Sequence, residues 1–204
     1  MGCPSDPTGR LRTHAGDVQV LPQTHRQPGR RAEYLPRSGA PGATAQQTHH
    51  ALAPLWEQVP TTLCHGDTHL GTTFRFADGR AGLLDWQVTH RAHGLRDVAY
   101  FMVSSLSPEM RRDHERELIA HYLEKLAQYG VDTPSEKDAW QLYRLFALDG
   151  WDASMSTIAF GGLQERANSE HALARANSAA EDLELAELVV GTMEGSWRLP
   201  PTPT

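Results

Sequence analysis

Two aspartates, Asp67 and Asp85, stand where the chain could bring their carboxylates to one place. Asp67 follows His65 and Gly66 in a polar stretch, and Asp85 follows the short apolar run 82–84. Two carboxylates beside a glycine and a histidine could hold a hard cation and act as a general base. The alternative for Asp67 is an ordinary loop aspartate that accepts hydrogen bonds from nearby backbone N–H groups.

A β-hairpin is the element expected to position this pair. Residues 72–76 alternate in polarity and are rich in β-branched and aromatic side chains, which predicts a half-buried strand. Asp78-Gly79 predicts a two-residue type I′ turn, and 82–84 return as an apolar strand. Such a hairpin would deliver Asp85 to the end of the ribbon at which Asp67 lies.

This stretch resembles the catalytic segment of the aminoglycoside phosphotransferase family, which includes choline kinase-like small-molecule kinases. The resemblance rests on His65-Gly66-Asp67, Thr72, Leu84-Asp85-Trp86-Gln87 and Arg96-Asp97-Val98-Ala99-Tyr100. It covers about residues 48–195, and it implies the fold of the C-terminal lobe of protein kinases.

The resemblance also implies a role for each matching residue. Asp67 would be the catalytic aspartate that accepts the proton of the acceptor hydroxyl, and Asp85 would bind the Mg²⁺ of ATP. His65 and Asp97 would hold the loop in shape, as packing and bracing residues. Thr72 stands where the family carries a metal-binding asparagine. Its hydroxyl is a shorter and poorer metal ligand, so we expect an impaired Mg²⁺ and ATP site.

Asp149 and Asp152 fall where the family's later helices wall the acceptor pocket. They could pair with a cationic substrate, but acids on the solvated face of a helix are the simpler interpretation.

Composition excludes several classes of protein. The 204 residues suit one domain or the larger part of a two-lobed enzyme, with 39% hydrophobic and 22% charged residues. A net charge of −6 argues against nucleic-acid binding, and without a long apolar run no membrane partner is expected. Cys3 and Cys64 lie far apart, which favours free thiols in a reducing cytoplasm. The oligomeric state stays open.

Residues 1–47 differ from the rest of the chain. They are rich in Arg, Pro, Gly, Gln and Thr and poor in apolar residues, which predicts a disordered, low-complexity segment. A complete kinase of this family would place an N-lobe here, with a lysine for the ATP phosphates. The first lysine is Lys125. We therefore expect the N-lobe to be largely missing.

The remainder predicts an α+β, mainly α fold with one β-hairpin. A short helix over 48–60 and a helix over 94–106, capped by Asp97, flank the hairpin. Three later helices are predicted: one over 108–129, one that starts at a capping box at 133–136 and runs to 160, and one over 163–193. Residues 196–204 are predicted to form a loose tail.

Three function classes remain open. The first is an ATP- and Mg²⁺-dependent kinase that phosphorylates a hydroxyl of a small molecule. The second is a catalytically inactive remnant of such a kinase, and the third is a helical binding module. A zinc site at His65, His69, His90, His93 and Cys64 is disfavoured, because Gly66 and Asp67 oppose the helix that this spacing would need.

Overall fold

The structure is a computed structural model that describes residues 52, 55, 56, 58–162 and 164–200. Its strands are β1 (Thr62–Cys64), β2 (Thr73–Arg75), β3 (Ala81–Leu83) and β4 (His90–Ala92). Its helices are α2 (Leu95–Ser105), α3 (Pro108–Gln128), α4 (Glu136–Phe160), α5 (Arg166–Asp182) and α6 (Leu185–Met193), with the single 3₁₀ turns η1 (Leu70–Thr72) and η2 (Trp86–Val88). The prediction of an α+β, mainly α fold is confirmed, while the predicted disorder of 1–47 lies outside the described residues.

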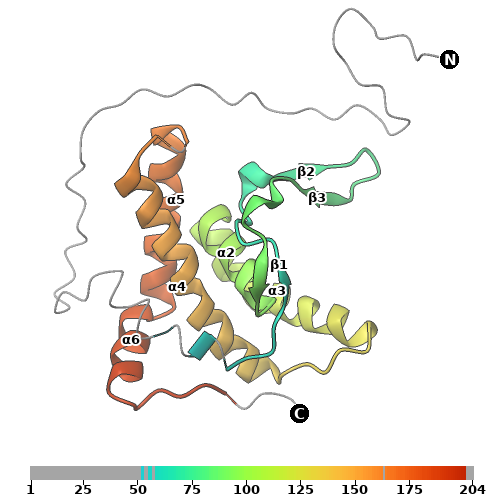
Figure 1. Ribbon diagram of the computed structural model, residues 1–204, viewed down its shortest axis with the longest axis vertical. Helices are drawn as coiled ribbons and strands as arrows, with labels where there is room; N and C mark the ends of the chain where they lie inside the picture. The colour runs from blue at the N-terminus through green and yellow to red at the C-terminus, as the bar shows by residue number, and fades with distance from the viewer. Residues whose placement is uncertain (1–51, 53–54, 57, 163, 201–204) are drawn as a thin grey trace, which may run out of the picture.

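The helices pack around α2 and α4. Figure 1 shows α2 at the centre of the molecule, with α4 and α5 side by side along one flank. The apolar side chains that α2 and α4 turn toward each other are almost fully buried, among them Leu95, Met102, Tyr143 and Phe146. Leu52, in the helical turn that precedes β1, joins the same core. The described residues therefore share one hydrophobic core.

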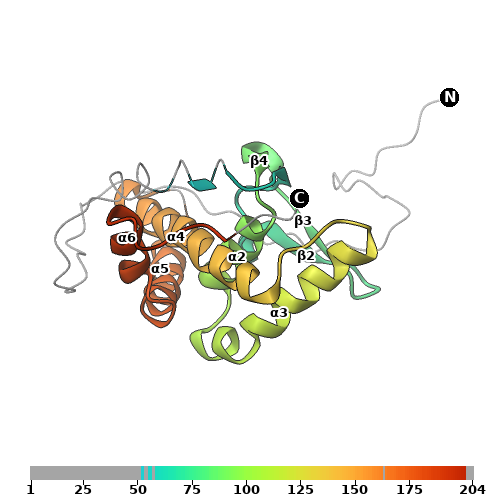
Figure 2. The same cartoon turned by 90° about the horizontal axis from the view of Figure 1, so that it is seen from below.

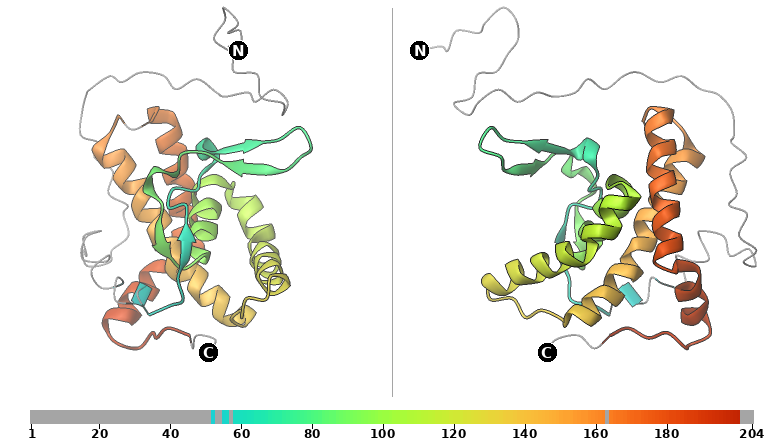
Figure 3. Two further views of the ribbon diagram at one scale, coloured as in Figure 1. Left: turned by 45° about the vertical axis from the view of Figure 1, so that its right-hand side comes forward. Right: turned by 180° about the vertical axis from the view of Figure 1, so that it is seen from behind.

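The strands form two separate antiparallel pairs. β2 pairs with β3, as the hairpin prediction required, with Phe74 opposite Gly82. β1 pairs with β4, with Cys64 opposite His90, and this ribbon was not predicted. Figure 3 shows the β2–β3 hairpin extending away from the helices, and Figure 2 shows β4 on the side of the molecule opposite α3.

The hairpin turn differs from the predicted type I′ turn. Only Gly79 has a positive φ, of 89°, and the N–H of Phe76 donates to the carbonyl of Arg80. The loop is therefore one residue longer than predicted, a turn that ends in a left-handed glycine. The Asp78 carboxylate accepts hydrogen bonds from the backbone N–H and the Nε of Arg80, which stabilises this longer loop.

Helix boundaries follow the sequence signals with two corrections. α3 begins at Pro108 as predicted, with Ser107 as its N-cap, and α4 continues through Gly150 to Phe160. The cap of α4 is Ser135, whose hydroxyl accepts from the N–H of Asp138, so the predicted box at 133–136 was placed two residues early.

The predicted helix over 163–193 is two helices. Glu184 has a positive φ of 52° and separates α5 from α6. The guanidinium of Arg144 in α4 donates to the carbonyl oxygens of Leu183 and Glu184 at 2.7 and 3.3 Å. A tertiary contact thus satisfies the backbone groups that the break exposes, which a local pattern does not reveal.

Candidate active site

The loop that carries Asp67 is fixed to the first turn of α2 by Asp97. The two carboxylate oxygens of Asp97 accept from the backbone N–H groups of His65 and Gly66, at 2.6 and 3.0 Å. The Thr68 hydroxyl donates to the Asp97 carbonyl at 2.7 Å. Asp97 therefore braces the loop, rather than capping its own helix: the N-cap of α2 is Gly94, which makes no side-chain cap bond.

His65 joins the Asp67 loop to the chain that leads to Asp85. Its Nδ1 accepts from the N–H of Asp67 at 3.2 Å, so in the neutral ring the proton is on Nε2, which donates to the Leu84 carbonyl at 2.6 Å. The side chain is 1% exposed, and the Trp86 ring packs against it edge to face. His65 therefore positions both aspartates and is no free base.

Gly66 permits this tight arrangement. Its φ of +88° is unfavourable for any residue with a Cβ, and an added Cβ would lie 2.6 Å from the Val88 carbonyl oxygen. The loop can therefore pass close to the segment after β3 only with glycine at this position.

The Asp67 carboxylate is oriented by two side chains. The Tyr100 hydroxyl donates to Oδ1 at 2.9 Å, and the Nε2 of His69 lies 3.6 Å from Oδ2. His69 and then Tyr100 favour the charged carboxylate, and they hold the pKa of Asp67 below its usual value although partial burial opposes them. The side chain remains 34% exposed, so Asp67 is ionised at neutral pH and still accessible to a ligand.

Asp85 presents a second carboxylate at the end of β3. The residue is exposed and adopts a left-handed conformation, with φ 62° and ψ 64°, which aspartate tolerates better than most residues. Its side chain makes no cap hydrogen bond to η2. The preceding Leu84 is held from both sides, since its N–H donates to the Thr72 carbonyl at 2.7 Å and its carbonyl accepts from His65.

The Thr72 hydroxyl serves the loop backbone. It accepts from the N–H of His69 at 3.1 Å and lies 2.9 Å from the carbonyl oxygens of Asp67 and His69, which share its single proton. Thr72 is 5% exposed. The hydroxyl is therefore engaged within the protein, and the metal-ligand role that the resemblance implies for Thr72 stays a prediction.

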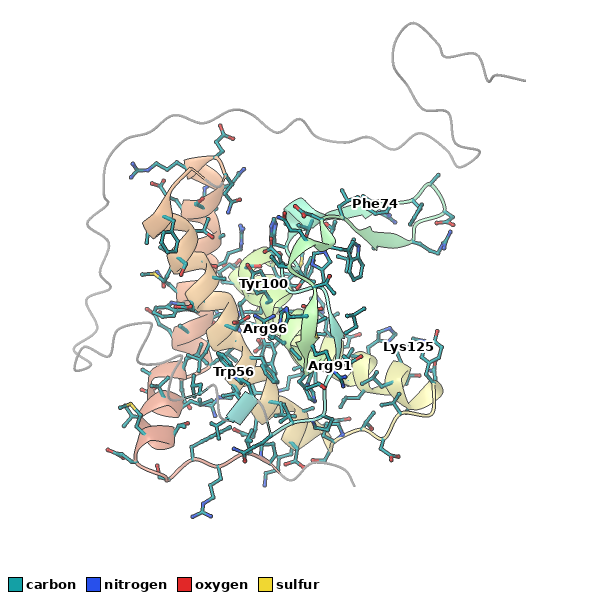
Figure 4. All side chains as sticks on the ribbon, in the orientation of Figure 1. Trp56, Phe74, Arg91, Arg96, Tyr100 and Lys125 are labelled. Atoms are coloured by element: carbon teal, nitrogen blue, oxygen red, sulfur yellow. The ribbon has the colours of Figure 1, made fainter. Side chains whose placement is uncertain are left out.

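Of the two aspartates of α4, Asp149 contacts α2 rather than the Asp67 loop. Asp149 forms an ion pair with Arg96 of α2 at 2.7 Å, with 14% of its side chain exposed. Figure 4 shows Arg96 and Tyr100 together on the side of α2 that faces α4. Asp149 and Asp152 do not line the pocket described next, so their role toward a substrate stays a prediction.

A pocket of about 350 Å³ opens beside the Asp67 loop, where η1, α2, α4 and α5 approach one another. Both side chains that contact the Asp67 carboxylate, Tyr100 and His69, line it. Sequence reasoning considered His69 only as a disfavoured zinc ligand and gave Tyr100 no role of its own, although Tyr100 belongs to the motif that carries the resemblance. A signal was present for Tyr100, which follows Asp97 by three residues and so lies on the same face of α2.

The candidate zinc ligands do not form a metal site. In the part of the chain that the structure describes, no three His, Cys, Asp or Glu side chains gather as a metal site would need. Burial raises the pKa of the Cys64 thiol to about 11, which disfavours the thiolate that would bind zinc. Among the helices that the structure describes, none has the length and hydrophobicity needed to cross a bilayer.

Comparison with known proteins bears on the same segment. Residues 45–131 match the model of the ecdysteroid kinase-like family. The matched part holds the Asp67 loop, both ribbons, α2 and α3, and it supports a kinase-like small-molecule kinase relationship. No curated protein and no solved structure matches the chain. The narrower assignment to aminoglycoside phosphotransferases or choline kinases stays a prediction.

Proposed function

We propose that this chain carries the catalytic centre of a phosphotransferase that moves the γ-phosphoryl group of ATP to a hydroxyl of a small molecule. The observation that supports this most is the Asp67 carboxylate, which is ionised and is oriented by Tyr100 and His69, two side chains that line a pocket. The match of the same segment to a kinase-like family agrees with it.

Asp67 would accept the hydrogen bond of the acceptor hydroxyl and take up its proton. Phosphoryl transfer needs positioning and charge neutralisation more than covalent help, so a carboxylate with a low pKa suffices. Tyr100 fixes one carboxylate oxygen, and the other remains beside His69 at the pocket. The hydroxyl of a molecule bound in the pocket would therefore meet a preoriented acceptor.

Asp85 fits a magnesium ion that arrives with the nucleotide. Mg²⁺ is commonly bound through one or two carboxylates, with waters and substrate phosphates as the other ligands. Asp85 is exposed and next to the His65-bound carbonyl of Leu84, whereas the Thr72 hydroxyl is occupied. Magnesium would supply charge neutralisation at the phosphates, and Asp85 would be the protein ligand that holds it.

The occupied Thr72 hydroxyl favours a second candidate, an inactive kinase-like protein that still binds a small molecule. In this case the pocket would bind its ligand without phosphoryl transfer.

Thermal denaturation with and without Mg·ATP tests the proposal. Binding to the folded state alone should raise the Tm, and Asp85→Asn should abolish this rise, whereas Asp113→Asn on the exposed face of α3 should leave it unchanged. Asp67→Asn should keep the Tm rise and lose ADP formation in the presence of hydroxylated acceptors. An unchanged Tm on addition of Mg·ATP would exclude the phosphotransferase. A Tm rise without ADP formation by the wild-type chain would favour the inactive, ligand-binding protein.

A further inference from the structure

The pocket beside Asp67 is lined by polar side chains, and its charged lining residue is an arginine. Its walls come from η1, α2, α4, α5 and the segment before α5. Its lining residues are His69, Leu70, Gly71, Tyr100, Ser104, Ser105, Ser154, Thr157, Gln164, Asn168, Ser169, His171, Ala172 and Arg175. This lining contains an arginine and two histidines but no aspartate or glutamate. The lining is therefore polar and carries the permanent charge of Arg175, and the Asp67 carboxylate reaches this lining through its contacts with Tyr100 and His69.

Arg175 of α5 is the permanent charge in this wall. Its Nε donates to the Ser104 carbonyl at 2.7 Å, and no ion pair joins its guanidinium to a carboxylate of the described residues. Partial burial lowers the pKa of Arg175, and no neighbouring acid counteracts this effect. A guanidinium has five N–H donors, so the bond to Ser104 leaves most of them for another acceptor.

The contact to Ser104 has a structural interpretation, which the test must separate from ligand binding. Ser104 lies in the last turn of α2, where free carbonyl groups favour a cation. This interpretation accounts for the Nε of Arg175, but it does not account for the remaining donors of the guanidinium, which has no ion-pair partner among the described residues and lies in a pocket whose lining contains no aspartate or glutamate.

Neighbouring side chains on α5 extend the same surface. Asn168 and His171 precede Arg175 by seven and four residues, which places all three on one face of the helix. By contrast, several pocket hydroxyls are already satisfied, since Ser154 and Thr157 donate to carbonyl groups of their own helix. The donors that face a ligand thus come chiefly from α5.

We propose that the pocket takes a hydroxylated small molecule that carries an oxyanion, a phosphate or a carboxylate, and that Arg175 binds this group. The inference rests on the proposed function, in that the hydroxyl of the same molecule would lie toward Asp67. Planar guanidinium donors match the oxygens of both anions. An ammonium-bearing acceptor is disfavoured, because the unneutralised guanidinium repels it.

Four related sugars test this preference without nucleotide. Glucose 6-phosphate, gluconate, glucose and glucosamine are titrated calorimetrically into the full-length protein near neutral pH. At least one of the two anions should bind about tenfold or more tightly than glucose, and glucosamine should bind most weakly. The comparison of glucose 6-phosphate with gluconate shows whether phosphate or carboxylate is the preferred group.

Three variants connect the preference to Arg175. Arg175→Gln should weaken binding of the preferred anion about tenfold, and Arg175→Lys should retain more of it because the charge remains. Arg166→Gln removes a charge from the exposed start of the same helix and should leave binding unchanged. The Tm of each variant reports any structural loss separately.

Several results would overturn the inference. These are equal binding of glucosamine and the anions, unchanged anion binding in Arg175→Gln even where its Tm falls, or no binding of any sugar at millimolar concentration. If Mg·ATP still raises the Tm in that last case, only the anion site fails. If the anions bind through Arg175 but Mg·ATP has no effect, the site stands and the phosphotransferase proposal fails.

Discussion

At the residue scale, the state of Asp67 depends on the side chains that its two oxygens meet. Tyr100 and His69 contact different oxygens of the Asp67 carboxylate, Tyr100 from α2 and His69 from two residues along the loop. Burial and the nearby Asp67 charge raise the pKa of Tyr100 far above its usual value, so its hydroxyl remains a proton donor at any ordinary pH. The pair therefore holds Asp67 charged.

Tyr100→Phe should raise the pKa of Asp67, because it removes one of the bonds that stabilise the carboxylate. A lowered pKa stabilises the folded chain above pH 3.8, and this contribution is lost as the pH falls through the lowered value. The variant should therefore lose more stability at neutral pH than at about pH 3. Carboxyl ¹³C NMR titration measures the pKa, and Tyr129→Phe at an 85% exposed position is the control.

Thr72 gives a second prediction at this scale. Thr72→Val keeps the shape but leaves the N–H of His69 and the carbonyl of Asp67 without the hydroxyl, which should cost about 1–3 kcal/mol. Thr72→Ser should cost less, because it retains the hydroxyl. Urea denaturation of both variants measures this. Equal stability of Thr72→Val and the wild type would show that the hydroxyl does not brace the loop.

At the element scale, a buried ionic cluster joins α3, α4 and α5. Arg111 is 1% exposed and donates to Glu115 at 2.6 Å and to Asp182 at the end of α5. The Tyr143 hydroxyl of α4 donates to the same Glu115 oxygen at 3.0 Å. Every charge in the cluster has a partner, which is the condition for burying it.

Arg111→Leu should destabilise the fold by about 3–5 kcal/mol, because it leaves the carboxylate of Glu115 buried without its cation. Arg112→Leu is the matched control on the next residue. Arg112 also binds Asp182, but its side chain is 48% exposed, so its loss should cost much less. Similar unfolding midpoints for the two variants would contradict the distinction between buried and exposed pairs.

The break between α5 and α6 is a second element with a measurable energy. Glu184 has a left-handed φ of 52°, which strains a residue with a Cβ. Glu184→Gly relieves this strain and should raise stability by up to about 1 kcal/mol. Ala174→Gly within α5 should lower it by about 1 kcal/mol. Thermal unfolding of both variants checks that the sign of the glycine effect depends on φ.

At the scale of the whole molecule, the chain after α6 returns to the core. The backbone N–H of Trp197 donates to the Gly191 carbonyl at 2.8 Å, and the Trp197 and Leu199 side chains pack against the buried cluster. The described part of the predicted loose tail, residues 196–200, is thus anchored, and residues 201–204 lie outside the described chain.

Trp197→Ala should therefore lower the stability of the whole fold by about 1–3 kcal/mol, through the apolar surface that it exposes to water. Arg198→Ala, at the exposed next position, should have little effect. Chemical denaturation measures both variants. Unchanged stability of Trp197→Ala would show that the tail is held by its backbone bond alone.

Local patterns were sufficient to predict the hairpin strands, the start of α3 and the glycine ends of α3 and α4. Each of these depends on neighbours in sequence: alternation for β2 and β3, Ser107-Pro108 for α3, Gly130 and Gly161 for the helix ends. The candidate residues of the loop were predicted from a resemblance whose spacing is also local. Strands and helix ends of this kind are decided by the backbone dihedral preferences of neighbouring residues and by the spacing of polar and apolar side chains along the chain.

The tertiary structure alone decided what those residues contact. The bond from Asp97 to the His65 loop, the bond from Tyr100 to Asp67, and the Arg144 contact at the α5–α6 break each join segments about 30 or more residues apart. The pocket exists only where three helices and a loop meet, and so does the isolated charge of Arg175. Side-chain contacts across the fold depend on how helices pack in space, and no periodicity along the chain records that arrangement.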